Sequence, residues 1–339
     1  MLRGIVTCFV ALCSLSFLFF TNVALSADAP SRDFVLIGSG SMTGVYYSIG
    51  GGLCKFVVSG YGERHPGDAL ICSTASTSGS VYNLNAMRRG AMDIGAAQSD
   101  IGYYAYAGKN LYSSEQPMQN LRLLAQLHRE YLTLIVRADS GIKTIDDIKG
   151  KRVNIGAPGT GIRSAMLGLM ELKGWTTKDF LVMSDLRASE QVQALCDGKV
   201  DVISDFIGHP NASMQEVAAT CGSVVLSLDA DLIAKVIEKY PYYQEGMIPG
   251  NTYSNIPYDV HTISIRASIY ATTELSDEMA YITVKSIASN LVRFRELSAA
   301  LRNLTLADLR GASSRGSAFE VPLHKGAEEF YRDFGLITG

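Results

Sequence analysis

Three short loops rich in glycine and hydroxyl side chains constrain the fold of this chain more than any other feature, because each stands between a predicted strand and a predicted helix. The loops occupy residues 38–44, 76–80 and 156–161. Apolar runs precede them at residues 34–37, 70–73 and 152–155. The repeated order of strand, loop and helix predicts an α/β fold in which mainly parallel sheets are flanked by helices.

Further apolar runs predict the remaining strands, and no repeat or low-complexity linker interrupts them. These runs lie at residues 94–97, 121–127, 132–137, 200–204, 224–228 and 260–265. The segment 98–100 is expected to cap a tyrosine-rich turn, and Ser213 with Glu216 has the spacing of a helix capping box. A length of 339 residues suffices for about two domains, and a second unit is predicted to begin after Arg137.

The N-terminus has the pattern of a secretory signal peptide. Arg3 supplies a positive charge, residues 5–20 are mainly apolar, and small residues follow. We therefore expect a signal peptide at 1–27, cut near Ser26 and Ala27, and an exported mature chain. A membrane anchor is the alternative, but the apolar core has 16 residues whereas a spanning helix needs about 20.

Four cysteines remain after the predicted cleavage, and an exported chain can join them as disulfides. Of their three possible pairings we favour Cys54 with Cys72 and Cys196 with Cys221, because each pair closes a short loop within one predicted unit. Metal binding is the competing interpretation. No C-x-x-C motif occurs and the five histidines are scattered, so no metal site is predicted.

Composition and motifs argue against several classes of function. Thirty basic and 33 acidic residues give a net charge of −3 without a basic run, which disfavours a nucleic-acid binder. The loop at 156–161 lacks the Lys-Ser/Thr ending of a phosphate loop, and no G-x-S-x-G or H-E-x-x-H motif occurs, so neither a cofactor nor a common hydrolase site is indicated. Asp201, Asp205 and His209 keep a secreted hydrolase or transferase open as an alternative.

The three loops predict an anion-binding cleft. A helix start offers unpaired N–H groups and the positive end of the helix dipole, both of which favour a carboxylate. Thr43, Thr77 and Thr160 can add hydroxyl donors, and Arg163 in a first helical turn can pair with a carboxylate. The alternatives are that the small residues serve only tight turns and that Arg163 is a solvated surface residue.

At these loops the chain resembles the TAXI family, the solute receptors of TRAP (tripartite ATP-independent periplasmic) transporters. The matching segments are residues 38–47, 76–81, 97–100, 147–153, 158–161, 208–211 and 322–324, in order along the mature chain. The resemblance implies a two-lobed type II periplasmic-binding-protein fold with its ligand cleft at the hinge. We place lobe I at 31–132 plus 260–339 and lobe II at 133–259.

The resemblance also implies a function. The chain is expected to be a periplasmic, non-enzymatic receptor that binds a small carboxylate or amino acid such as glutamate and delivers it to the membrane subunits of a TRAP transporter. A sensor input module is a further alternative. The candidate ligand-binding residues are Ser39, Met42, Thr43, Gly44, Tyr46, Thr77, Ser78, Gln98, Asp100, Thr160, Gly161, Arg163, Asp205 and His209.

Departures from the family pattern gather near the expected pocket. Ser41, Met42 and Ser78 stand where the family is richer in glycine, and Ser48 and Lys325 replace prolines; Asp205 lies where an aromatic residue is common. Because Asp205 or Asp100 can accept a hydrogen bond from an ammonium group, these changes favour an amino acid over a dicarboxylate.

Overall fold

A computed structural model describes residues 32–311 and 321–337. The predicted signal peptide and its cleavage point lie outside the described residues. The described part of the chain contains ten strands. They are β1 Arg32–Gly38, β2 Ala69–Ala75, β3 Ile94–Gln98, β4 Leu121–Arg137, β5 Arg152–Asn154, β6 Val182–Ser184, β7 Val202–Ile207, β8 Ser223–Leu226, β9 Gln244–Ile248 and β10 Val260–Thr272.

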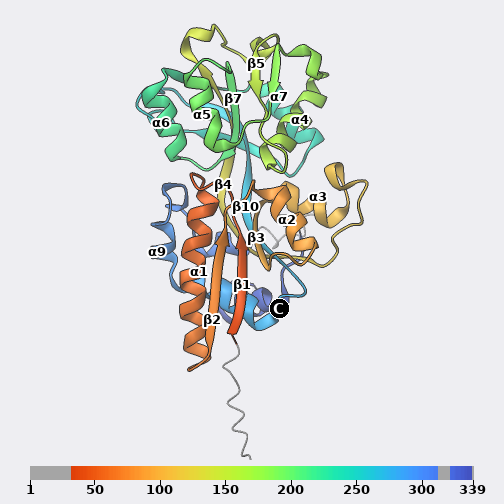
Figure 1. Ribbon diagram of the computed structural model, residues 1–339, viewed down its shortest axis with the longest axis vertical. Helices are drawn as coiled ribbons and strands as arrows, with labels where there is room; N and C mark the ends of the chain where they lie inside the picture. Colours follow the sequence, from red (N-terminus) through yellow and green to blue (C-terminus); the bar gives the residue numbers. More distant parts are fainter. Residues whose placement is uncertain (1–31, 312–320, 338–339) are drawn as a thin grey trace, which may run out of the picture. The chain divides into compact units, whose positions relative to one another are not determined.

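All ten strands belong to one sheet with the order β2-β1-β3-β10-β4-β7-β5-β6, in which β8 pairs with β4 and β9 with β10. β1 runs parallel to β2 and β3, and β5 runs parallel to β6 and β7. The long strands β4 and β10 pair with each other in antiparallel orientation and join these two parallel groups. They run through both groups of elements in Figure 1.

Helices connect and cover the strands, as a parallel arrangement requires. They are α1 Val45–Arg64, α2 Ser80–Arg88, α3 Ser99–Ala107, α4 Gly161–Lys173, α5 Ala188–Cys196, α6 Ala212–Thr220, α7 Ala230–Lys239, α8 Asp277–Ser289, α9 Leu291–Arg295, α10 Leu306–Leu309 and α11 Lys325–Asp333. None of the helices within 32–311 and 321–337 is both long and apolar enough to cross a bilayer.

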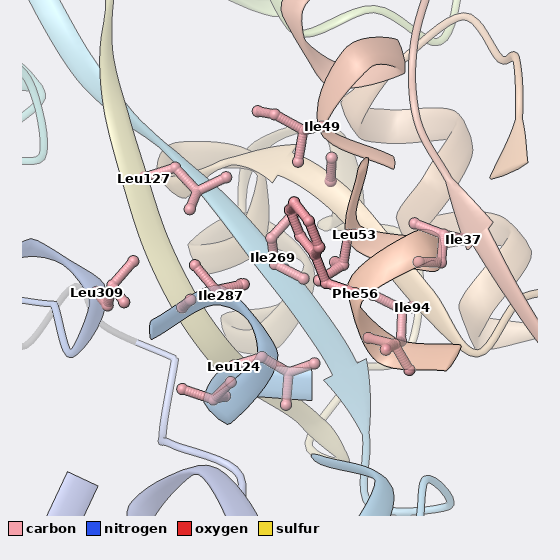
Figure 2. Packing of buried hydrophobic residues seen from close by; sticks show 14 of the residues in the cluster. Ile37, Ile49, Leu53, Phe56, Ile94, Leu124, Leu127, Ile269, Ile287 and Leu309 are labelled. Carbon is pink, nitrogen blue, oxygen red and sulfur yellow. The ribbon is translucent and has the colours of Figure 1, made fainter. Parts of the chain in front are cut away.

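Buried apolar side chains divide these elements into two groups. Two core clusters draw on residues 35–127 and 267–331, which we call the β1 side, and two draw on residues 132–265, which we call the β7 side. On the β1 side, Ile49 and Leu53 of α1 face Ile269 of β10 and Ile287 of α8 (Figure 2), and all four side chains are fully buried. The four-residue spacing of Ile49, Leu53 and Val57 gives α1 the apolar stripe that packs there.

The structure corrects several local predictions. The runs at 121–127 and 132–137 form one continuous strand of 17 residues, because β4 pairs along its whole length with β10, β7 and β8. The tyrosine-rich segment after Gln98 is the helix α3 rather than a turn. Asn211, not Ser213, caps α6, since its Oδ1 accepts hydrogen bonds from the N–H groups of Ser213 and Met214.

Both favoured disulfide pairings are confirmed. Cys54 of α1 is bonded to Cys72 of β2, with Cα atoms 5.3 Å apart. Cys196 at the end of α5 is bonded to Cys221 after α6, with Cα atoms 5.0 Å apart. Each bond therefore joins elements of a single side.

Candidate functional site

A cavity of about 120 Å³ lies where the first turns of five helices converge. These helices are α1, α2, α4, α5 and α6. Sites for drug-sized ligands span roughly 300–1,000 Å³, so this cavity suits a smaller solute. Its lining comprises Gly40, Ser41, Thr43, Gly44, Val45, Tyr46, Ser78, Gly79, Ser80, Gln98, Glu130, Gly156, Ala157, Thr160, Gly161, Ile162, Leu186, Ala188, Gln191, Ser204, Asp205, Phe206, Ile207, Asn211 and Ser213. These residues come from both the β1 side and the β7 side.

The predicted loops reach the cavity because they follow the carboxyl ends of parallel strands, where ligands of open α/β sheets bind. Hydrogen bonds between the first two loops hold them together. Ser39 donates its hydroxyl to the Ala75 carbonyl at 2.6 Å, and Thr77 donates its hydroxyl to the Ser39 carbonyl at 3.0 Å. These two hydroxyls therefore organise the loops and do not line the cavity.

The helix starts differ in how their first N–H groups are satisfied. The α4 start is capped by the Thr160 hydroxyl and the α6 start by Asn211, whereas α1 and α2 begin after Gly44 and Gly79, which have no capping side chain. Gly79 adopts a φ of 114°, a backbone conformation that favours glycine. The first residues of α1 and α2, namely Val45, Tyr46 and Ser80, line the cavity, so the positive dipole end of each helix lies beside it and favours a carboxylate.

Gln98, at the end of β3, is a buried polar side chain of the cavity lining. It is 3% exposed and lines the cavity, and its Oε1 has no hydrogen-bond partner among the described residues. Its backbone N–H donates to the Ser80 hydroxyl at 3.1 Å, which fixes the position of the strand end. Its Oε1 occupies the space that a Cβ at Gly161 would take, so any larger residue at 161 would require the Gln98 amide to move.

Two carboxyl groups line the cavity. Glu130 of β4 is 4% exposed and accepts a hydrogen bond from the Tyr46 hydroxyl at 3.0 Å, while His128 Nε2 lies 3.6 Å from its other oxygen. Asp205 of β7 accepts hydrogen bonds from Gln191 Nε2 at 3.0 Å and from the Phe206 N–H at 2.9 Å. Burial, reinforced by the Glu130 charge, raises the pKa of Asp205 to about 7.

No basic side chain balances these carboxyl groups in the lining, which contains no lysine, arginine or histidine among the residues that the structure describes. Arg163 turns instead to the Gly156 carbonyl, to which it donates at 3.0 Å, and it borders a separate hollow beside α4. The backbone N–H of Arg163 donates to the Thr160 hydroxyl. Arg163 therefore does not line the cavity, and its expected pairing with a ligand carboxylate stays a prediction.

The structure brings eight of the fourteen predicted site residues into the lining. They are Thr43, Gly44, Tyr46, Ser78, Gln98, Thr160, Gly161 and Asp205. The other six, Ser39, Met42, Thr77, Asp100, Arg163 and His209, lie outside it. Met42 is 71% exposed at the surface.

His209 and Asp100 are engaged elsewhere. The ring nitrogens of His209 lie 2.9 Å from the Thr133 hydroxyl and 2.6 Å from the Tyr253 hydroxyl, and burial lowers its pKa to about 3, so the ring is neutral. Asp100 accepts a hydrogen bond from the Tyr243 hydroxyl at 2.9 Å, and burial raises its pKa to about 7. His209 is thus held by β4 and by the segment between β9 and β10, and Asp100 is held by Tyr243.

Several lining residues escaped the sequence reasoning. Glu130 and Gln191 sit inside a strand and a helix rather than in a glycine-rich loop, so no local motif marks them. Gln191 nevertheless links the site: Asn154 donates to Gln191, which donates to Asp205. Glu130 stands in a polar stretch, residues 128–131, between two apolar runs, so nothing in the local sequence distinguishes it from its neighbours.

The β1 side and the β7 side touch each other beside the cavity. The Tyr82 N–H of α2 donates to the Gly159 carbonyl at 3.2 Å, and the Asp100–Tyr243 hydrogen bond also joins the two sides. Tyr104 and Tyr242 add a hydrogen bond between their hydroxyls. The structure therefore shows the cavity with its two walls in contact.

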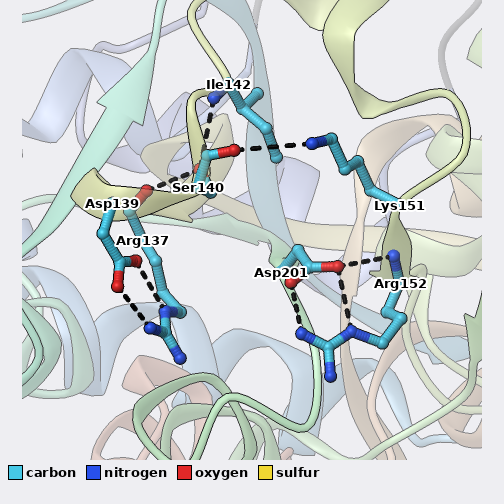
Figure 3. Close-up of polar contacts among 7 residues, drawn as sticks. All are labelled: Arg137, Asp139, Ser140, Ile142, Lys151, Arg152 and Asp201. Atoms are coloured by element: carbon cyan, nitrogen blue, oxygen red, sulfur yellow. Dashed lines mark hydrogen bonds and ion pairs between the residues drawn. The ribbon is translucent and has the colours of Figure 1, made fainter.

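Asp201, which was considered with Asp205 and His209 for the enzyme alternative, has a structural role. Asp201 accepts hydrogen bonds from the Arg152 backbone N–H at 2.9 Å and from its guanidinium Nε at 3.0 Å (Figure 3), and this contact lowers the pKa of Asp201. Across residues 32–311 and 321–337, no group of three His, Cys, Asp or Glu side chains could hold a metal ion.

Comparisons with known proteins agree with this architecture. The periplasmic binding protein BugD is 13% identical to this chain, with a TM-score of 0.55, over 91% of this chain and 99% of its own. A protein of Bordetella bronchiseptica RB50 is 17% identical, with a TM-score of 0.54, over 89% of this chain and 98% of its own. These similarities confirm the predicted α/β fold of the periplasmic binding proteins. A family description covers residues 37–335, and the chain belongs to the NMT1-like family.

Proposed function

We propose that this protein is an extracytoplasmic solute receptor that encloses a small carboxylate or amino acid in the cavity and releases it unchanged. The observation that carries the proposal is the meeting of five helix starts from two separately cored sides around one small cavity. Membership of the NMT1-like family and the similarity to a periplasmic binding protein support it.

Binding is proposed to draw two lobes together. The core clusters separate between residues 127 and 132 and between 265 and 267, which supports the lobes at 31–132 plus 260–339 and at 133–259. β4 and β10 are the strands that pass between them and would act as the hinge. A solute that contacts both walls favours the closed arrangement by its higher affinity for it.

The resemblance to the TAXI family supports the rest of the proposal. The receptor would act in the periplasm after removal of a signal peptide, bind a glutamate-like solute, and present it to the membrane subunits of a TRAP transporter. No observation specifically favours the enzyme alternative, because His209 is held by Thr133 and Tyr253 outside the cavity lining.

Native mass spectrometry of the protein purified from its host tests the receptor role, followed by a thermal-shift panel of amino acids and dicarboxylates. We expect a bound metabolite that is recovered chemically unchanged, and a melting temperature that rises with the concentration of a binding solute. Turnover of the bound compound would contradict the proposal, and so would the absence of both a co-purified solute and a binder in the panel.

A further inference from the structure

A second hollow, of about 220 Å³, lies beside α4. Of the described residues, only Thr160 lines both this hollow and the cavity. Its walls come from both sides: α4 and the loop before it belong to the β7 side, whereas the start of α2 and the short 3-10 helix Asn110–Tyr112 belong to the β1 side. An apolar cavity of roughly 150 Å³ admits a benzene ring, so this hollow has room for a small organic molecule.

Three aliphatic side chains form the apolar part of the hollow. Val81 lies in the first turn of α2, Leu111 in the 3-10 helix and Leu167 in α4. Leu167 is 45% exposed, although leucine is among the residues that are most often buried. A ligand that covers these side chains gains free energy in proportion to the apolar surface that it removes from water.

The charged groups of the hollow leave a positive charge without a partner. Glu171 accepts hydrogen bonds from Lys239 Nζ at 2.9 Å and from the Tyr240 hydroxyl at 3.2 Å, so its charge is already balanced. Arg163 donates from Nη1 to the Gly156 carbonyl at 3.0 Å and forms no ion pair within the described part of the chain. A guanidinium has five N–H donors, so a single acceptor leaves most of them unused.

We propose that this hollow is a second ligand site, which binds a small amphipathic carboxylate: one carboxyl group joined to an aromatic ring or a short aliphatic chain. Arg163 pairs with the carboxylate through the fork of its guanidinium, and Ser164 beside it in the lining adds a hydroxyl donor. The three aliphatic side chains cover the apolar group. A dicarboxylate fits less well, because the other charged side chain of the lining is Glu171.

A ligand in this hollow contacts both sides of the molecule. Gly159 belongs to the lining, and its carbonyl accepts the hydrogen bond from the Tyr82 N–H that joins the β7 side to the β1 side. The ligand therefore favours the arrangement in which these two walls touch, by its higher affinity for it. The inference does not rest on the proposed receptor function, since the hollow and its ligand are distinct from the cavity and its solute.

A crystal of the unmodified protein soaked with 4-bromobenzoate locates the site. The anomalous signal of the bromine should place the compound in the hollow, with its carboxylate on Arg163, whether or not a second molecule occupies the cavity. Bromine found only in the cavity or only elsewhere on the surface, or no bromine at all, would overturn the proposal.

Isothermal titration calorimetry measures the binding in solution. It compares 4-bromobenzoate with 4-bromobenzamide, which has nearly the same shape without the charge. We expect a Kd of roughly 1 mM or tighter for the acid and a Kd higher by roughly 10-fold or more for the amide, because hydrogen bonds to charged groups are the stronger ones. No measurable binding of the acid, or equal affinity for the two compounds, would contradict the site.

Variants test the role of Arg163. Arg163→Gln should weaken 4-bromobenzoate by roughly 10-fold or more, and Arg163→Lys, which keeps the charge without the fork, should bind with an affinity between those of Arg163→Gln and the unmodified protein. Arg302→Gln is the matched control, because Arg302 is exposed and lies outside the lining of both the hollow and the cavity, and it should bind normally. Circular dichroism and the melting temperature establish that the variants are folded.

The outcomes separate the two proposals. Unchanged affinity for 4-bromobenzoate in Arg163→Gln would overturn the second site and leave the receptor standing. The receptor is overturned instead when no solute co-purifies and no amino acid or dicarboxylate of the thermal-shift panel binds, and that result leaves the second site standing if 4-bromobenzoate binds in the hollow.

Discussion

At the scale of single residues, the contact between Gly161 and Gln98 determines how closely the start of α4 approaches the end of β3. Because a Cβ at residue 161 would overlap the Gln98 amide, Gly161→Ala should displace this buried side chain from the cavity wall or hold the two sides of the cavity apart. We expect affinity for the co-purified solute to fall by roughly 10-fold or more, measured by calorimetry. Wild-type affinity would contradict the proposed closed geometry.

Gly168→Ala in the same helix is the control. A Cβ at residue 168 would make ordinary contacts with the Tyr240 side chain, the nearest at 3.5 Å. Alanine in a helix interior is favoured over glycine by about 1 kcal/mol, so this variant should be slightly more stable and bind normally.

A second prediction concerns the buried carboxyl of Asp100. Its pKa is raised from 3.8 to about 7 by burial, so between these values the folded protein binds a proton that the unfolded chain releases. The contribution of Asp100 to the free energy of unfolding is therefore most favourable below pH 3.8 and declines until the pH passes about 7. Asp100→Asn removes that decline.

The measurement compares wild type with Asp100→Asn by chemical denaturation without ligand. The variant should gain on the order of 2 kcal/mol relative to wild type between about pH 5.5 and 7. The comparison is needed because the lowered pKa of buried His209 gives the opposite trend in both proteins. A difference between the two proteins that is constant with pH would contradict the raised pKa.

Some residues of the candidate site could be predicted from the sequence, and others could not. Gly44, Ser78 and Gly161 were found because glycine and hydroxyl residues at strand ends follow from local backbone chemistry. Glu130 and Gln191 were missed because their position depends on the pairing of β4 with β7 and on the Asn154 contact, which are distant in the sequence. A local sequence pattern carries no information about contacts between residues that are distant in the sequence.

At the scale of elements, the α6 start shows how a capping residue is selected by geometry. Asn211 Oδ1 accepts hydrogen bonds from the Ser213 and Met214 N–H groups, at 2.9 and 3.3 Å. Asn211→Ala should lower the free energy of unfolding by about 1 kcal/mol, as cap removal does elsewhere. Urea denaturation measures this change.

Ser213→Ala is the paired variant, because Ser213 was the predicted cap and lies inside the helix. Removal of the Ser213 hydroxyl should change the free energy of unfolding by less than about 0.5 kcal/mol. Equal destabilisation by both substitutions would contradict the assignment of the cap to Asn211.

The boundaries of β4 could not be predicted from the local sequence. Residues 128–131, His-Arg-Glu-Tyr, interrupt the apolar pattern, so two strands were predicted where β4 is continuous. These polar residues are accommodated because His128 and Glu130 lie against each other and Tyr46 donates to Glu130. Strand pairing with β10 therefore overrode the local signal, as tertiary context does for β-propensity.

At the scale of the whole described molecule, the two sides have separate cores and separate disulfides and share two strands. Such a construction allows each side to move as a unit while β4 and β10 bend. The contacts that would break on opening include the Tyr82–Gly159 and Asp100–Tyr243 hydrogen bonds and the tyrosine pair beside them. A solute that binds both sides adds its own contacts to these and favours the closed arrangement.

A disulfide across the cavity mouth tests that closure. A Cβ built at Gly159 lies 3.7 Å from the Ser78 Cβ, within the roughly 3.5–4.5 Å that disulfides require. The positive φ of Gly159, 87°, costs a cysteine there about 1–2 kcal/mol, so the bond should form without unfolding. Mass spectrometry verifies the bond in the variant Ser78→Cys with Gly159→Cys.

The oxidised variant is then compared with Gly159→Ser, which has a side chain at the same position but cannot form this bond, by small-angle X-ray scattering and by the rate of solute uptake. With its walls linked, the oxidised variant should keep one radius of gyration with and without solute, and its uptake should be slower by roughly 10-fold or more because entry requires opening. Gly159→Ser should contract when solute is added. Equal uptake rates would mean that the solute enters without separation of the β1 and β7 sides, and the hinge at β4 and β10 would have to be abandoned.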